Sequence, residues 1–224
     1  MKSIISFCIY GSNPKYAKAA IESAKLQPEI YPGWQCRFYV DNSVPQDVIQ
    51  KLVDLDCEVV VKPKTKGHLG MFWRFEPLKD ETIERFIVRD TDSRLNVREA
   101  AAVQEWIESG KEFHVMRDNP QHGAKICGGM WGATQEFIQK EKDVYDKEVA
   151  NYLAAVPFDK IHGARGMYFN MDQPWLWQYI WPKIVNSHIA HIMDLPNLRF
   201  TGNEKLFPIE NPDKSFVGQP YDYE

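Results

Sequence analysis

Short apolar segments alternate with amphipathic segments through the first half of the chain. The first apolar segment (residues 3–10, SIISFCIY) leads through a Gly-Ser-Asn-Pro turn into an Ala- and Lys-rich segment at 16–26, which predicts a helix. The same order recurs, with strands predicted over 35–40, 57–61, 86–88 and 112–116 and helices over 46–55, 69–75 and 99–109. Repeated units of this length predict an α/β fold in which helices cover both faces of a mostly parallel central sheet.

The pattern changes after about residue 120. The segment KICGGMWGAT (125–134) predicts a strand interrupted by glycines, and a helix is predicted over 135–152. An aromatic segment at 167–184 follows, in which Trp177 and Trp181 are expected to pack into the core. The last ~25 residues have little periodicity and are expected to wrap the surface. Because no repeat or linker divides the sequence, we expect a single domain over residues 1–224.

Composition indicates a soluble, cytoplasmic protein. The chain has 224 residues and a net charge of -4, which argues against a general nucleic-acid-binding protein. No stretch approaches the roughly 20 apolar residues of a membrane span, and the N-terminal segment is interpreted as a strand rather than a signal peptide. The four cysteines form no C-x-x-C pair, so buried free thiols in a reducing compartment are predicted.

Two acids stand one residue apart where a buried strand ends, in FIVRDTDSRL (86–95). Alternate residues of an extended segment point to one side, so Asp90 and Asp92 are able to reach the same cation. Mg²⁺ and Mn²⁺ prefer such oxygen ligands, and ligands of open α/β sheets bind at the carboxyl ends of the strands. A metal site is therefore predicted here, with a solvated strand end or a helix N-cap as the alternative.

Several segments together resemble the nucleotide-sugar glycosyltransferases of the GT-A fold. They are FCIYGSNPKYAKAAIESAKL, RFYVDN, GHLGMFWRFEPLKD, the D-x-D segment, HVMRDNP, GGMWG and MDQPWL. The similarity extends to about residue 195 and points to a small single-domain branch found in bacteria and large algal viruses. It implies a GT-A domain with a nucleotide-sugar-binding half over about 1–118, an acceptor-binding half over about 119–195 and a surface-wrapping tail over 196–224.

The resemblance also implies an activity and its donor site. A metal-dependent hexosyl- or deoxyhexosyltransferase would use Mn²⁺ or Mg²⁺ and move a sugar from a nucleoside diphosphate, expected to be UDP, to a glycan or glycolipid. Charge-assisted hydrogen bonds from arginines would stabilise the charge that develops on the diphosphate, although each arginine has a structural ion pair as its alternative. The expected donor-binding residues are Tyr10, Gly11, Asp41, Arg74, Arg89, Asp90 and Arg117.

The remaining expected residues would bind the acceptor, supply the catalytic carboxylate or bind the metal. Gly128 and Gly129 would let an acceptor sugar approach the backbone beside the Trp131 ring, or would only mark a bulge. Asp172 is expected to act as the general base of an inverting enzyme, or to orient the sugar in a retaining one, with N-capping as the structural alternative. The resemblance favours His191, rather than His188, as a third metal ligand beside Asp90 and Asp92.

Two other functions stay open from the sequence. A phosphotransferase or nucleotidyltransferase would use the same acid pair, although the residues after Gly11 match a phosphate-binding loop poorly. A carbohydrate-binding protein would keep the fold without catalysing transfer.

Overall fold

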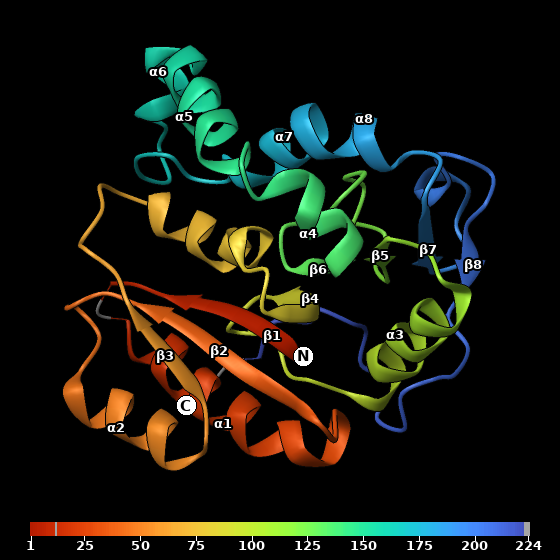
Figure 1. The fold of residues 1–224 in the computed structure, drawn as a ribbon, viewed down its shortest axis with the longest axis horizontal. Helices are drawn as coiled ribbons and strands as arrows, with labels where there is room; N and C mark the ends of the chain where they lie inside the picture. The colour runs from red at the N-terminus through yellow and green to blue at the C-terminus, as the bar shows by residue number, and fades with distance from the viewer. Residues whose placement is uncertain (12, 222–224) are drawn as a thin grey trace.

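The central feature of the computed structural model is a twisted sheet, and the structure describes residues 1–11 and 13–221. Among these residues eight strands form one sheet in the order β3-β2-β1-β4-β6-β5-β7-β8 (Figure 1). Neighbouring strands are parallel except for β6, which runs antiparallel to both β4 and β5. The predicted α/β fold with a mostly parallel sheet is confirmed. The strands are β1 Lys2–Ile9, β2 Trp34–Val40, β3 Glu58–Val61, β4 Ile83–Arg89, β5 Phe113–Arg117, β6 Met130–Thr134, β7 His188–Ile192 and β8 Lys205–Leu206.

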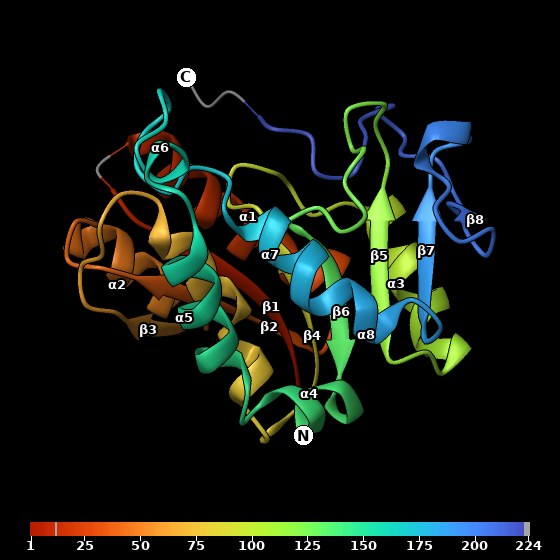
Figure 2. The same cartoon turned by 90° about the horizontal axis from the view of Figure 1, so that it is seen from above.

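Helices cover both faces of this sheet, as Figures 1 and 2 show. One face carries α1 Pro14–Ile30, α2 Gln46–Asp54 and α3 Val97–Ser109. The other carries the 3₁₀ helix η1 Leu69–Lys79, α4 Gln135–Glu141, α5 Tyr145–Ala155, α7 Asp172–Trp175, the π-helical turn Leu176–Ile180 and α8 Trp181–Ile184. Two shorter helices, α6 Phe158–Ile161 and the 3₁₀ turn Pro196–Leu198, complete the described elements.

Alternation along the strands explains the two cores. In β1, Ile4 packs against the η1 side while Ile5 and Phe7 pack against α1 and α2, because successive side chains point to opposite faces. All three are fully buried, which is why the strand appears in the sequence as an apolar run interrupted only by Ser6, itself buried.

The turn between β1 and α1 brings a helix start to the carboxyl end of β1. Gly11 has a φ of +80°, a left-handed conformation that glycine adopts readily. Asn13 then caps α1, since its side chain accepts a hydrogen bond from the Lys15 N–H at 3.0 Å, and Pro14 occupies the first helical position. The helix consequently begins two residues before the predicted 16–26, and it also continues to Ile30.

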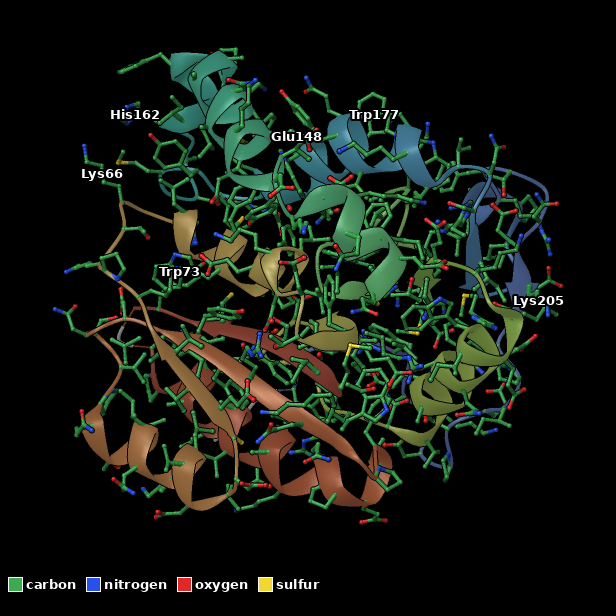
Figure 3. The ribbon with its side chains drawn as sticks, in the orientation of Figure 1. Lys66, Trp73, Glu148, His162, Trp177 and Lys205 are labelled. Carbon is green, nitrogen blue, oxygen red and sulfur yellow. The ribbon has the colours of Figure 1, made fainter. Side chains whose placement is uncertain are left out.

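Two expectations about the second half are corrected, and the structure defines one segment that the sequence left unassigned. The helix predicted over 135–152 is broken between α4 and α5. Residues 188–192 form strand β7, which places His188 and His191 on opposite faces. Trp177 is 59% exposed rather than buried and points outward from its helix (Figure 3), whereas Trp181 is buried as expected.

The C-terminal tail crosses the surface but is also anchored in the interior. Leu198 and Val217 are fully buried, and β8 adds an edge strand to the sheet. The Arg98 guanidinium forms two hydrogen bonds to Asp118, both of 2.8 Å, and the Val217 N–H donates to the same carboxylate. The tail is therefore packed against α3 and the end of β5.

The four cysteines are buried free thiols, as predicted. Over residues 1–11 and 13–221, every helix is too short or too polar to cross a membrane.

Candidate active site

A cavity of about 700 Å³ opens at the carboxyl ends of β1 and β4. The first turn of α1, the start of η1, the loop at 166–170 and the start of α7 complete its wall. Such an edge is where parallel α/β sheets bind their ligands. The predicted residues that line it are Tyr10, Gly11, Arg74, Asp90, Asp92, Gly128 and Asp172.

Arg74 joins two acids that are far apart in the sequence. One guanidinium nitrogen forms an ion pair with Asp90, and the other lies 2.7 Å from the Asp172 carboxylate. Burial would lower the pKa of Arg74, but the charges of Asp90 and Asp172 raise that pKa well above its ordinary value. The arginine is therefore a permanent cation that fixes the separation of the two acids. The other Asp172 oxygen accepts the Gln173 N–H at 2.9 Å. The N-cap position of α7 is Met171 and no side chain of the described residues caps that helix start, so the structure does not support the N-capping alternative.

The second acid of the pair has a cation of its own. The Lys15 Nζ lies 3.4 Å from the nearer Asp92 carboxylate oxygen. Burial, and next the charge of Asp90, raise the pKa of Asp92 above its ordinary value, while Lys15 opposes this shift. The turn is held by Thr91, whose hydroxyl donates to the Cys8 carbonyl at 2.8 Å. Two carboxylates that repel one another are thus fixed at the edge of the cavity.

Gly128 and Gly129 are required by this cluster. A Cβ on Gly129 would collide with the Asp90 carboxylate and would lie 2.7 Å from the Asp90 backbone nitrogen. A Cβ on Gly128 would collide with the Asp172 carboxylate and lie 2.8 Å from an Arg74 nitrogen. Side chains of the protein itself make the close approach that was expected of an acceptor sugar. Gly128 still lines the cavity, whereas Gly129 is not among its lining residues.

An aromatic wall closes the other side of the cavity. The Tyr10 ring contacts the His68 ring edge-on, with 6.0 Å between centroids, and His68 contacts Phe169 at 5.4 Å. The backbone N–H of His68 donates a hydrogen bond to the Met167 carbonyl at 2.9 Å, which connects the loop after β3 to the loop before α7. Figure 3 shows Lys66 and His162 on the side of the molecule where these two loops meet.

The structure does not bring Arg89 or Arg117 to the cavity, and both expectations are corrected. Arg89 is the residue before Asp90 on β4, so its side chain points to the opposite face. There it is 1% exposed and pairs with Glu99 at 3.3 Å. The Arg117 guanidinium is fully buried and donates to the carbonyls of Leu198 and Lys125.

Trp131, His191 and Asp41 also lie elsewhere. Trp131 is fully buried in the core, stacked on Phe113 with 5.1 Å between centroids, so it offers no ring to an acceptor. His191 is fully buried on the α3 side, where it contacts His114 at 2.9 Å and Glu105 at 3.1 Å instead of the acid pair.

Asp41 lies beneath the cavity wall rather than in it. Its carboxylate accepts the Ser43 N–H at 3.0 Å, and the Ser43 hydroxyl accepts the Gly11 N–H at 2.8 Å. Asp41 therefore supports the turn after β1 and is only indirectly connected to the cavity.

The acid pair fits a hard divalent cation. Both carboxylates face the cavity, and the side chains of Asp90 and Asp92 are 43% and 23% exposed, so their oxygens are accessible. Within the described residues no group of three or more Asp, Glu, His or Cys side chains is placed to hold a metal. Mg²⁺ or Mn²⁺ would therefore take two protein ligands here, and such ions commonly complete their shell with water and substrate phosphates.

Comparison with known proteins supports the fold. No protein-family model matches the chain, and no curated protein matches its sequence. A glycosyltransferase involved in glycosylation of the major capsid of PBCV-1 is similar over 86% of this chain and 82% of its own, with 17% identity and a TM-score of 0.52. This similarity supports the assignment of a GT-A-type glycosyltransferase fold, as the sequence resemblance predicted.

Two further structures have TM-scores below 0.5 and add no argument. One is glucosyl-3-phosphoglycerate synthase from Mycobacterium tuberculosis in complex with Mn²⁺, UDP and phosphoglyceric acid, similar over 65% of this chain and 64% of its own (10% identity, TM-score 0.41). The other is a Bacillus anthracis protein named as a glucose-1-phosphate thymidylyltransferase, similar over 87% of each chain (13% identity, TM-score 0.49).

Sequence reasoning missed some residues of the site. Tyr16, which follows the turn after β1, and His68, Met167 and Phe169, which come from loops without periodicity, line the cavity. Lys15 is not a lining residue but pairs with Asp92 at the edge of the cavity. A lysine in the first turn of the helix after β1 was a usable signal for Lys15, because that turn faces the carboxyl edge of the sheet. The contact between the two loops had no comparable signal.

Proposed function

We propose that the protein is a metal-dependent glycosyltransferase. It would move one hexose or deoxyhexose from a nucleoside diphosphate, with UDP as the first candidate, to a hydroxyl of a glycan or glycolipid. The observation that carries this proposal is the pairing of Asp90 and Asp92 at the mouth of a cavity, with Arg74 linking Asp90 to a third acid, Asp172. The GT-A-type fold supports the same reading.

Each group has a role in the displacement. A bond forms between the acceptor hydroxyl oxygen and the anomeric carbon while the bond from that carbon to the phosphate oxygen breaks, and the electron pair leaves with the diphosphate. Mg²⁺ or Mn²⁺ held by Asp90 and Asp92 would act as a Lewis acid toward that charge. Arg74 keeps Asp90 and Asp172 at a fixed distance, which preorganises the site.

Asp172 is the proposed catalytic carboxylate. Each of its oxygens accepts one hydrogen bond within the protein and keeps lone pairs free, so the carboxylate is able to accept another. In an inverting enzyme it would take the proton of the acceptor hydroxyl, and in a retaining one it would stabilise positive charge at the anomeric carbon. The anomeric configuration of the product, determined by NMR, distinguishes the two roles.

The test uses thermal-shift measurements with UDP-, GDP- and dTDP-sugars, each with and without Mn²⁺. We expect one nucleotide sugar to raise the melting temperature only with Mn²⁺, and Asp90→Asn to remove that shift and lower transfer by roughly 10²–10³. The control is Asp194→Asn, which removes an exposed carboxylate paired with Arg199 far along the chain. Normal transfer by Asp90→Asn at saturating Mn²⁺ would exclude the metal assignment.

Analysis of the products separates the other functions. A nucleotidyltransferase would release pyrophosphate or a sugar phosphate rather than a nucleoside diphosphate. A carbohydrate-binding protein would release neither.

A further inference from the structure

The two acids of the pair are each held by a different cation, and the two cations differ in mobility. Arg74 is buried between Asp90 and Asp172 and has an ion pair on each side, so it has no room to leave. Lys15 contacts Asp92 at 3.4 Å, and its side chain is 27% exposed on a flexible four-carbon stem. Of the two cations, Lys15 is the one that can change partners.

Lys15 also stands where a diphosphate would arrive. It lies in the first turn of α1, between Asn13 and Tyr16, and both of these neighbours line the cavity. The positive end of the helix dipole lies on the same side and favours anions there. A dication bound to both carboxylates would repel the Lys15 ammonium group from Asp92. Phosphates bound to the same dication would then lie close to that ammonium group.

We infer that Lys15 is a donor-binding residue that exchanges partners. Without nucleotide it neutralises Asp92 and competes with the metal ion, and with nucleotide it leaves Asp92 and binds the diphosphate of the donor. The inference rests on the proposed function, because it assumes a nucleoside diphosphate and a divalent cation in this cavity. A purely structural ion pair predicts something different, because its loss would change stability and leave both binding constants unchanged.

The exchange predicts opposite changes in two binding constants. In Lys15→Met, Asp92 loses its competitor, so Mn²⁺ alone should bind roughly two- to fivefold more tightly. UDP at saturating Mn²⁺ should bind roughly tenfold or more weakly, because a charge-assisted hydrogen bond to phosphate is lost. Lys15→Arg keeps the charge and should fall between Lys15→Met and wild type in both measurements.

Isothermal titration calorimetry with Mn²⁺ alone, and with UDP in the presence of Mn²⁺, measures both constants. The matched control is Lys25→Met, which removes a lysine of the same helix that pairs with Glu22 at 2.8 Å. The melting temperature of each variant shows whether it is folded, and Lys25→Met should leave both constants at their wild-type values.

The outcomes separate this inference from the proposed function. Tighter Mn²⁺ binding together with weaker UDP binding supports the exchange. Two unchanged constants, a change in only one, or two changes in the same direction overturn it. Wild-type protein that binds no UDP overturns the proposed function and the phosphate half of the exchange, while the Mn²⁺ titration still decides whether Lys15 competes at Asp92.

Discussion

The contact between Gly129 and Asp90 makes Gly129→Ala a sharp test of the site. The added methyl group would collide with the Asp90 carboxylate and lie 2.7 Å from the Asp90 backbone nitrogen. The carboxylate is able to rotate away, but the backbone nitrogen moves only if the end of β4 shifts. Overpacking of this kind typically costs about 1–3 kcal/mol, so we expect the free energy of unfolding to fall by that amount.

The same substitution should weaken donor binding. If Asp90 rotates, its ion pair with Arg74 breaks and the acid pair no longer presents both carboxylates together. We expect the affinity for UDP with Mn²⁺, measured by calorimetry, to fall roughly tenfold or more, which corresponds to about 1.4 kcal/mol.

Gly123→Ala is the matched control for Gly129→Ala. Gly123 has no heavy atom within 4 Å of an added Cβ, and its backbone is not in the left-handed region. This variant should keep the wild-type affinity and lose no stability. A folded Gly129→Ala protein that binds UDP and Mn²⁺ as tightly as wild type would refute the placement of Asp90 at the metal.

Three other substitutions test separate parts of the molecule. Asp172→Asn should lower transfer roughly 10²–10³-fold while UDP affinity stays within a few-fold of wild type, and normal turnover would leave Asp172 only a structural ion-pair partner of Arg74. Glu99→Gln should cost about 3 kcal/mol in a urea melt, because it leaves the Arg89 charge buried without its partner, and weaker UDP binding would return Arg89 to the donor site. Burial and the charge of His191 hold the pKa of His114 well below 6.5. Below pH 6.5 the unfolded chain therefore takes up a proton at His114 that the folded protein does not, so the neutral imidazole stabilises the fold above pH 6.5 and this stabilisation is lost as the pH falls. Between about pH 7.5 and about pH 5.5 wild type should lose about 1.4 kcal/mol more than His114→Gln, and equal losses would contradict this pKa.

The alternation of strands and helices was predictable because the parallel strands β1 and β2 are buried on both faces. Such strands appear in the sequence as largely apolar runs, interrupted by Ser6 in β1 and by Arg37 in β2, that end at Gly11 or at Asp41 and Asn42. Strand β7 was not predictable in the same way. Its five residues include His188 and His191, and the second of these is satisfied in the interior by contacts with His114 on β5 and Glu105 on α3, which local sequence does not reveal.

The acid pair was predictable because side chains alternate between the two sides of an extended segment. The same alternation predicts that Arg89 points away from the cavity. If Asp90 and Asp92 point to one side, the residue immediately before Asp90 points to the other. The role of Gly128 and Gly129 was not accessible, because the side chains that crowd them come from positions 74, 90 and 172. Local pattern therefore predicted which residues end the strands, and tertiary packing decides which of them meet.

The charges of the cavity predict that metal and nucleotide depend on one another. Asp90, Asp92 and Asp172 carry three negative charges, and Lys15 and Arg74 carry two positive ones, so the net charge of these five groups is -1. UDP-glucose carries two negative charges on its phosphates, so it alone would bring the site to -3, and a dication alone would bring it to +1. Bound together they leave the site at -1.

We therefore expect Mn²⁺ and UDP-glucose to raise the affinity of each other by the same factor, roughly 5- to 150-fold. Calorimetric titration of UDP-glucose in EDTA and in saturating Mn²⁺, and of Mn²⁺ with and without UDP-glucose, measures both sides of this coupling. Asp194→Asn serves as the control, because Asp194 pairs with Arg199 and is not a lining residue of the cavity. Equal affinities in EDTA and Mn²⁺ would mean that Lys15 and Arg74, rather than a metal ion, balance the charge of the diphosphate.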